Sequence, residues 1–172
     1  FDQGIANAFA DKGVSVVGLD SQKYFWNART PEETARKIAE IAQYYLQYKE
    51  VKSFRIMGYS FGACVAPFIA NKLPESLREK LSSLTLLSPD TKGDFEIHVA
   101  DMLSLGGNND PYDVVKEMEL SHSLKRLCLF GSDEDADITN SFRKTGAKIE
   151  ILPGGHHFDN AYTSIVNKVL EN

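Results

Sequence analysis

Short apolar runs typical of β-strands alternate with helical patterns along this chain, and this alternation limits the fold more than any other feature of the sequence. Parallel strands need a crossover connection between them, which is usually a helix. The pattern therefore predicts an α/β fold, with one mostly parallel sheet and helices on both faces. The expected strands are Val14–Leu19, Phe54–Met57, Leu81–Leu87, Arg126–Phe130 and Ala147–Leu152.

The helix with the clearest start follows Thr30, which is a favoured N-cap residue. Pro31 fills the first helical position and Glu33 completes a capping box. The 172 residues contain no linker long enough to divide them, so we expect a single domain over residues 1–172. The other expected helices are Phe1–Asp11, a segment from Phe61 to about Lys72, one from about Pro111, one ending near Lys144, and Ala161–Leu170.

The alternation is interrupted between Thr91 and Ser123. The expected features there are a short strand at Phe95–Val99, a loop at Gly106–Asn109 and the helix that starts near Pro111. This segment, residues 91–123, is interpreted as a lid or insert, in which the Gly106–Gly107 pair could act as a hinge.

The motif Gly58-Tyr59-Ser60-Phe61-Gly62 lies between a predicted strand and a predicted helix, the context in which it marks the nucleophile of an α/β-hydrolase. A tight turn there would lift Ser60 toward a base, and both flanking glycines are expected to be needed for close backbone approach. The backbone N–H of Phe61 would then stabilise an oxyanion. The alternative is a simple strand–helix turn whose serine only caps the helix.

A catalytic triad on this fold follows the order serine, acid, histidine, with the acid and the histidine each in a loop after a strand. The loop after Arg126–Phe130 is acidic, and the loop after Ala147–Leu152 contains two histidines. We prefer Asp135 as the acid and His156 as the base. The alternatives in the same loops are Asp133, Glu134, Asp137 and His157.

Other functional classes are less compatible with the sequence. The formal net charge is −5 and no basic stripe is present, so nucleic acid is not expected as a ligand. No apolar run approaches the roughly 20 residues of a transmembrane helix. A metal site at the two histidines and the acidic loop lacks a further ligand at metal-binding spacing, so no metal or cofactor is expected. Cys64 and Cys128 lie in apolar segments and are interpreted as small buried side chains.

One strand of the usual α/β-hydrolase sheet is expected to be missing. That strand precedes the first helix, lies centrally between Val14–Leu19 and Phe54–Met57, and leads into the loop that supplies the second oxyanion donor. The chain opens with Phe1 in a predicted helix. Because an empty central position would leave two rows of backbone groups unpaired, we expect a fragment of a longer protein, a cleaved chain whose N-terminal piece stays bound as a partner, or a rearranged sheet.

Several segments resemble the bacterial virulence protein family known as VirJ or AcvB. The stretch Phe95-Glu-Ile-His-Val99 is far more specific than the serine motif. The resemblance implies an exported, periplasmic α/β-hydrolase-like domain that hydrolyses lysyl-phosphatidylglycerol and is linked to virulence or type IV secretion. The matching segments are Val17–Ser21, Tyr24–Trp26, Arg29–Glu32, Gly58–Ala63, Asp94–Val99 and Gly154–Phe158.

Carried over by motif, the family's serine falls on Ser60, its histidines on His156 and His157, and its acidic loop on Gly131–Asp137. An aminoacylated phospholipid contains an ester, which a serine triad can cleave, and an acidic chain would not repel its lysyl group.

Tyr59, Tyr24 and Trp26 are expected to contact substrate, with ordinary packing as the alternative. The competing functions are a non-catalytic binding module of a secretion system and a generic carboxylesterase or thioesterase.

Overall fold

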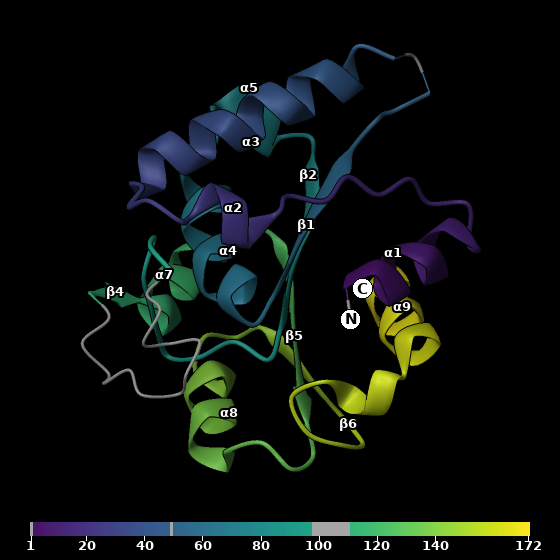
Figure 1. The fold of residues 1–172 in the computed structure, drawn as a ribbon, viewed down its shortest axis with the longest axis vertical. Helices are drawn as coiled ribbons and strands as arrows, with labels where there is room; N and C mark the ends of the chain where they lie inside the picture. Colours follow the sequence, from purple (N-terminus) through teal and green to yellow (C-terminus); the bar gives the residue numbers. More distant parts are fainter. Residues whose placement is uncertain (1, 49, 98–110) are drawn as a thin grey trace.

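The central layer is a four-stranded parallel sheet in the order β1-β2-β5-β6 (Figure 1). This computed structural model describes residues 2–48, 50–97 and 111–172. The strands are β1 (Phe54–Tyr59), β2 (Leu81–Leu87), β5 (Lys125–Gly131) and β6 (Lys148–Leu152). Four of the five strands expected for the main sheet are therefore confirmed.

Helices cover both faces of the sheet, as predicted (Figure 1). One face carries α1 (Asp2–Ala10) and α9 (Tyr162–Glu171). The other face carries α3 (Pro31–Leu46), α4 (Phe61–Lys72), α7 (Val114–Leu120) and α8 (Ala136–Arg143).

The core is divided by the sheet because successive residues of a strand point to opposite faces. In β5, Leu127 and Leu129 pack with α1 and α9, whereas Cys128 and Phe130 pack with the helices of the other face. Cys64 also lies in this second cluster, and both cysteines are buried and free, as predicted.

The start of α3 has the predicted capping box. The Thr30 hydroxyl accepts a hydrogen bond from the Glu33 amide, and the Glu33 carboxylate accepts one from the Thr30 amide, while Pro31 begins the helix. The capping signals in the sequence therefore place this helix start correctly.

The predicted strand at Val14–Leu19 is wrong, because residues 14–20 form no regular element. Within the part of the chain that the structure describes, β1 pairs only with β2 and forms an edge of the sheet. Without a strand beside it, the 14–19 segment has no ladder to join, and Val16 and Val17 are 45% and 52% exposed. Among the described residues, the sheet therefore ends at β1, on the side where a further central strand was expected.

The segment between β2 and β5 also differs from expectation. Residues 95–97 are not a strand. A two-residue strand β3 (Lys92–Gly93) pairs antiparallel with β4 (Tyr112–Asp113) instead. The buried Phe95 packs on Phe25, which explains the apolar pattern that was interpreted as a strand. His98–Val99 and the predicted Gly106–Asn109 loop lie outside the described residues.

The remaining elements are short: α2 (Ser21–Tyr24), α5 (Glu75–Arg78) and the 3₁₀ turn η1 (Phe158–Asn160). Among the helices of the described residues, none has the length and apolar character needed to cross a membrane.

Candidate active site

Ser60 occupies a strained turn between β1 and α4. Its backbone has φ 52° and ψ −117°, a conformation that L-residues rarely adopt, and its amide donates to the Leu87 carbonyl at 2.9 Å. A Cβ at Gly58 would collide with the backbone of Gly62, whereas a Cβ at Gly62 would meet no atom within 4 Å. The expectation that both glycines are needed for close approach is thus confirmed for Gly58 and wrong for Gly62.

A continuous hydrogen-bonded chain connects three side chains at the carboxyl ends of β1, β5 and β6. His156 Nε2 lies 2.9 Å from Ser60 Oγ, and His156 Nδ1 lies 2.8 Å from Glu134 Oε1. A neutral imidazole in this arrangement donates from Nδ1 to the carboxylate and accepts from the serine hydroxyl at Nε2. The geometry can therefore move a proton from Ser60 to His156.

The acid in contact with the histidine is Glu134, not the preferred Asp135. Asp135 is the N-cap of α8 and accepts from the Asp137 amide at 2.8 Å. Asp133 accepts from Ser132 at 2.9 Å. The choice of Asp135 is corrected because its carboxylate is engaged at the helix start, while the preceding residue turns back toward the histidine.

The Glu134 carboxylate is held at both oxygens. Oε2 accepts from the Gly131 amide at 2.7 Å and from the Ser88 hydroxyl at 2.8 Å. Burial alone would raise the pKa of Glu134, but the hydrogen bonds from His156, Gly131 and Ser88 outweigh it and hold the pKa below its ordinary value. The side chain is therefore a carboxylate at neutral pH.

Ser88 is a member of the site that the sequence analysis missed. It directly follows β2, is buried, and has φ 49°. Its hydroxyl lies within reach of both Glu134 and the His156 carbonyl, the latter at 3.4 Å. The only available sequence signal was a serine at the end of a predicted strand, one position before Pro89.

Phe61 begins α4, where the first N–H groups of a helix have no intrahelical acceptor. This places its amide directly after Ser60, as an oxyanion donor requires. Its ring packs on the buried Phe25 at 5.0 Å between centroids, which fixes the start of the helix against the core.

The three aromatic residues expected at the substrate differ in their surroundings. The Tyr59 hydroxyl lies 2.6 Å from His157 Nδ1. Tyr24 packs edge-on against Phe25 and lies under the Arg29 guanidinium. Trp26 is 57% exposed. Contact of any of them with substrate stays a prediction.

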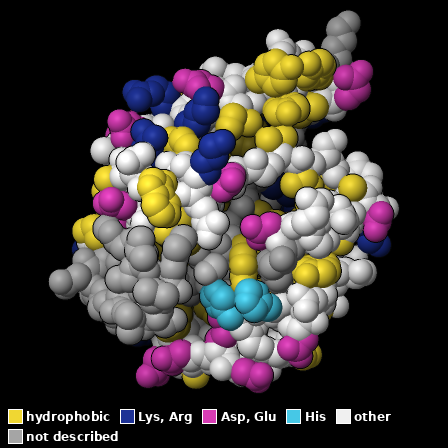
Figure 2. All heavy atoms as spheres, viewed as in Figure 1, with side chains coloured by type: hydrophobic (Ala, Val, Ile, Leu, Met, Phe, Trp, Pro, Cys, Tyr) yellow, Lys and Arg dark blue, Asp and Glu magenta, His cyan; other side chains and the backbone are white. Residues whose placement is uncertain are grey.

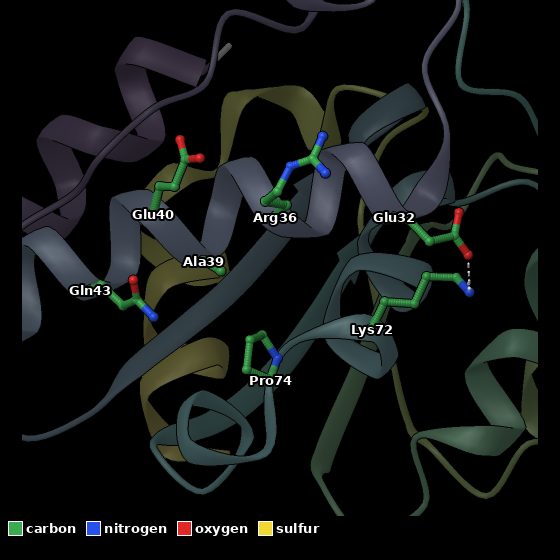
Figure 3. A pocket seen from close by; sticks show the side chains of 7 residues that line it. All are labelled: Glu32, Arg36, Ala39, Glu40, Gln43, Lys72 and Pro74. Carbon is green, nitrogen blue, oxygen red and sulfur yellow. Dashed lines mark ion pairs between the residues drawn. The ribbon is translucent and has the colours of Figure 1, made fainter.

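Histidine side chains gather at the surface of the face shown in Figure 2, so a substrate could reach them from solvent. A separate hollow lies between α3, the end of α4 and Pro74 (Figure 3). It is lined by four charged residues together with Ala39, Gln43 and Pro74, and two of the charged residues, Glu32 and Lys72, form an ion pair at 2.6 Å. None of Ser60, Glu134 or His156 lines it.

A comparison with known families matches residues 1–172 to the family described as "Bacterial virulence protein (VirJ)". The comparison with curated proteins finds no match.

Solved structures of similar fold include an alpha/beta hydrolase enzyme from the metagenome of lagoon sediments at Mar Chica, Morocco. It has a TM-score of 0.63 and 13% identity, over 98% of this chain and 81% of that one. A lipase-esterase related protein from Clostridium acetobutylicum has a TM-score of 0.57 and 15% identity, over 93% and 79%. A carboxyl esterase from Bacillus coagulans has a TM-score of 0.52 and 12% identity, over 85% of this chain and 73% of that one. At these identities the similarity shows the α/β-hydrolase fold alone.

Proposed function

Because the chain belongs to the VirJ family of bacterial virulence proteins, we propose that it is a serine hydrolase that cleaves the lysyl ester of an aminoacylated phospholipid. The observation that carries the proposal is the unbroken chain from Ser60 through His156 to Glu134. A serine that only capped α4 would bond to that helix, but Ser60 makes no side-chain cap.

The proposed reaction begins when His156 takes the proton from Ser60 Oγ, which attacks the ester carbonyl carbon. The oxyanion that forms is stabilised by the Phe61 amide, and the Glu134 carboxylate stabilises the imidazolium. His156 then protonates the leaving glycerol oxygen as the carbon–oxygen bond breaks. Water, activated by the same histidine, hydrolyses the resulting acyl ester on Ser60 and regenerates the hydroxyl.

Lysyl-phosphatidylglycerol is the proposed substrate. It is the lipid that the family resemblance implies, it contains an ester, and a chain with a net charge of −5 would not repel its cationic lysyl group. The same resemblance supports a periplasmic location and a link to virulence or type IV secretion.

The test is labelling of the purified protein with a fluorophosphonate, followed by release of free lysine from vesicles that contain lysyl-phosphatidylglycerol. Ser60→Ala and His156→Ala should both abolish labelling, while Ser164→Ala, which changes an exposed serine on α9, should retain it. Lysine release that disappears in Ser60→Ala would support the proposed substrate.

Absence of labelling in folded protein would contradict the hydrolase and favour a non-catalytic binding module. Labelling without lysine release, together with turnover of short acyl esters, would favour a generic carboxylesterase or thioesterase.

A further inference from the structure

A second contact joins the strand of the nucleophile to the loop of the histidine. Tyr59, the last residue of β1, places its hydroxyl 2.6 Å from His157 Nδ1. The two residues are 98 positions apart, and each is the direct neighbour of a residue in the proposed triad. The contact therefore runs beside the Ser60–His156 hydrogen bond.

The three rings pack together. The Tyr59 ring lies 5.4 Å from the His156 ring and 5.9 Å from the His157 ring, and the two histidine rings are 5.8 Å apart. Side-chain packing of this kind restricts the orientation of the imidazole that must face Ser60.

The hydroxyl of Tyr59 is a permanent donor near neutral pH. Burial, together with the nearby Asp2 and Glu134 carboxylates and Tyr162, raises the pKa of Tyr59 to about 12. The protonated phenol donates to the Nδ1 acceptor of a neutral His157, whose own proton is then on Nε2.

The histidine loop needs such support because its backbone is strained. Phe158, Asp159 and Asn160 are three consecutive non-glycine residues with φ 51°, 47° and 58°. Residues in this region persist only where the surroundings hold them.

The loop is already tied on the side of β5. The Asp133 amide donates to the Gly154 carbonyl at 3.0 Å, and the Gly154 amide lies 3.2 Å from Ser132 Oγ. The Tyr59–His157 bond adds an attachment on the opposite side, toward β1.

We infer that Tyr59 and His157 are positioning residues whose hydrogen bond fastens the histidine loop to β1 and thereby fixes His156 opposite Ser60. The kinetic consequence of this fastening rests on the proposed function, whereas the fastening itself does not. Neither side chain is required to contact the reacting atoms.

The experiment measures three variants: Tyr59→Phe, His157→Leu and the double variant that combines the two. His157→Asn is the control, because its amide oxygen can replace Nδ1 as acceptor. Tyr59→Phe retains the ring and removes only the hydroxyl. We expect amide hydrogen exchange over residues 153–160 to accelerate about tenfold in both single variants and no further in the double variant. His157→Asn should remain within about threefold of the original protein.

The second readout is the rate of fluorophosphonate labelling as a function of pH. Each single variant should label about tenfold more slowly, with the midpoint of the pH profile unchanged, because loop position alters the geometry and not the basicity of His156. Unchanged exchange in Tyr59→Phe and His157→Leu, or a double variant whose loss equals the product of the single losses, would overturn the inference. If the original protein does not label, the proposed function fails and the exchange rates alone decide on the fastening.

Discussion

Strands β1 and β5 both lead into a residue of the proposed triad, but the sheet supports them very differently. β5 pairs with β2 on one side and β6 on the other, and its residues Leu127–Gly131 are all buried. β1 pairs only with β2 among the described strands, and only its Gly58 is buried. Within the part of the chain that the structure describes, Glu134 thus follows a strand with two paired neighbours and Ser60 follows a strand with one.

Glu134 and Ser60 are therefore held in place by different kinds of contact. Glu134 is held by hydrogen bonds from Ser88 and the Gly131 amide, which lie on two adjacent strands or their ends. Ser60 is held by its own turn, through the close contact at Gly58 and the amide bond to Leu87. Substitutions near Glu134 and substitutions near Ser60 should therefore disturb the site in different ways.

The largest effect is expected on the β5 side from Glu134→Gln. The neutral amide cannot stabilise the imidazolium, so the labelling rate should fall about 10³–10⁴-fold while the fold is retained. The matched control is Asp135→Ala, which should label at nearly the original rate and lose about 1 kcal/mol of stability with the cap of α8. Greater loss of labelling in Asp135→Ala than in Glu134→Gln would return the acid role to Asp135.

On the β1 side, Gly58→Ala should slow labelling about 100-fold and lower the melting temperature, because the new Cβ forces the turn away from Gly62. Gly62→Ala is the control: its Cβ has open space, and alanine in a helix is more stable than glycine by about 0.5–1 kcal/mol. Equal damage by the two substitutions would contradict the role given to the close contact.

A smaller effect is expected from Ser88→Ala. It should slow labelling about tenfold and lower the free energy of unfolding by about 1.5 kcal/mol. The lost hydrogen bond should raise the pKa of Glu134 toward its ordinary value. A lowered carboxyl pKa stabilises the folded state above the unfolded-state pKa, and this stabilisation is lost as the pH falls through the folded-state value. The melting temperature of Ser88→Ala should therefore lie furthest below that of the original protein at about pH 7, and the difference should shrink below about pH 4.

The control for Ser88→Ala is Ser83→Ala, which lies within β2, the strand that Ser88 follows. The Ser83 hydroxyl is buried with no hydrogen-bond partner among the described residues, so its removal should be neutral or slightly stabilising at every pH. A stability loss in Ser88→Ala that does not change with pH would argue against its effect on Glu134.

The smallest effect is expected in the 14–19 segment. Val17→Thr should change the free energy of unfolding by less than about 0.5 kcal/mol, because the side chain is half exposed. The same substitution at the buried Val166 should cost about 1–3 kcal/mol through the unpaired hydroxyl. Denaturant unfolding of both variants measures the contrast, and a large loss in Val17→Thr would mean that the 14–19 segment packs more tightly than its exposure indicates.

The same contrast explains what the sequence could predict. Apolar periodicity located β1, β2, β5 and β6 because each has partners to pair with. It failed at Val14–Leu19 because a strand depends on a neighbour that no local pattern reveals. Membership of the VirJ family was recognisable from motifs and matches the whole chain.

Within the candidate site, the hydrogen-bonded pair Ser60 and His156 could be predicted because motif and position restrict each to one or two residues. The carboxylate that contacts His156 could not be predicted, because four neighbouring carboxylates satisfy the same spacing. A difference of one position along the loop decides which of them faces the histidine. One signal was available: a helix was expected to follow the acidic loop, and aspartate is a favoured N-cap residue.

The placement of the triad on three strands also has a consequence for folding kinetics. The hydrogen-bonded partners are 96 and 22 positions apart, and β2 must pair on both sides before β1 and β5 can present their ends together. Non-local parallel pairing is slow, whereas helices form in microseconds. After dilution from denaturant, helical signal should thus return well before the protein regains its ability to be labelled.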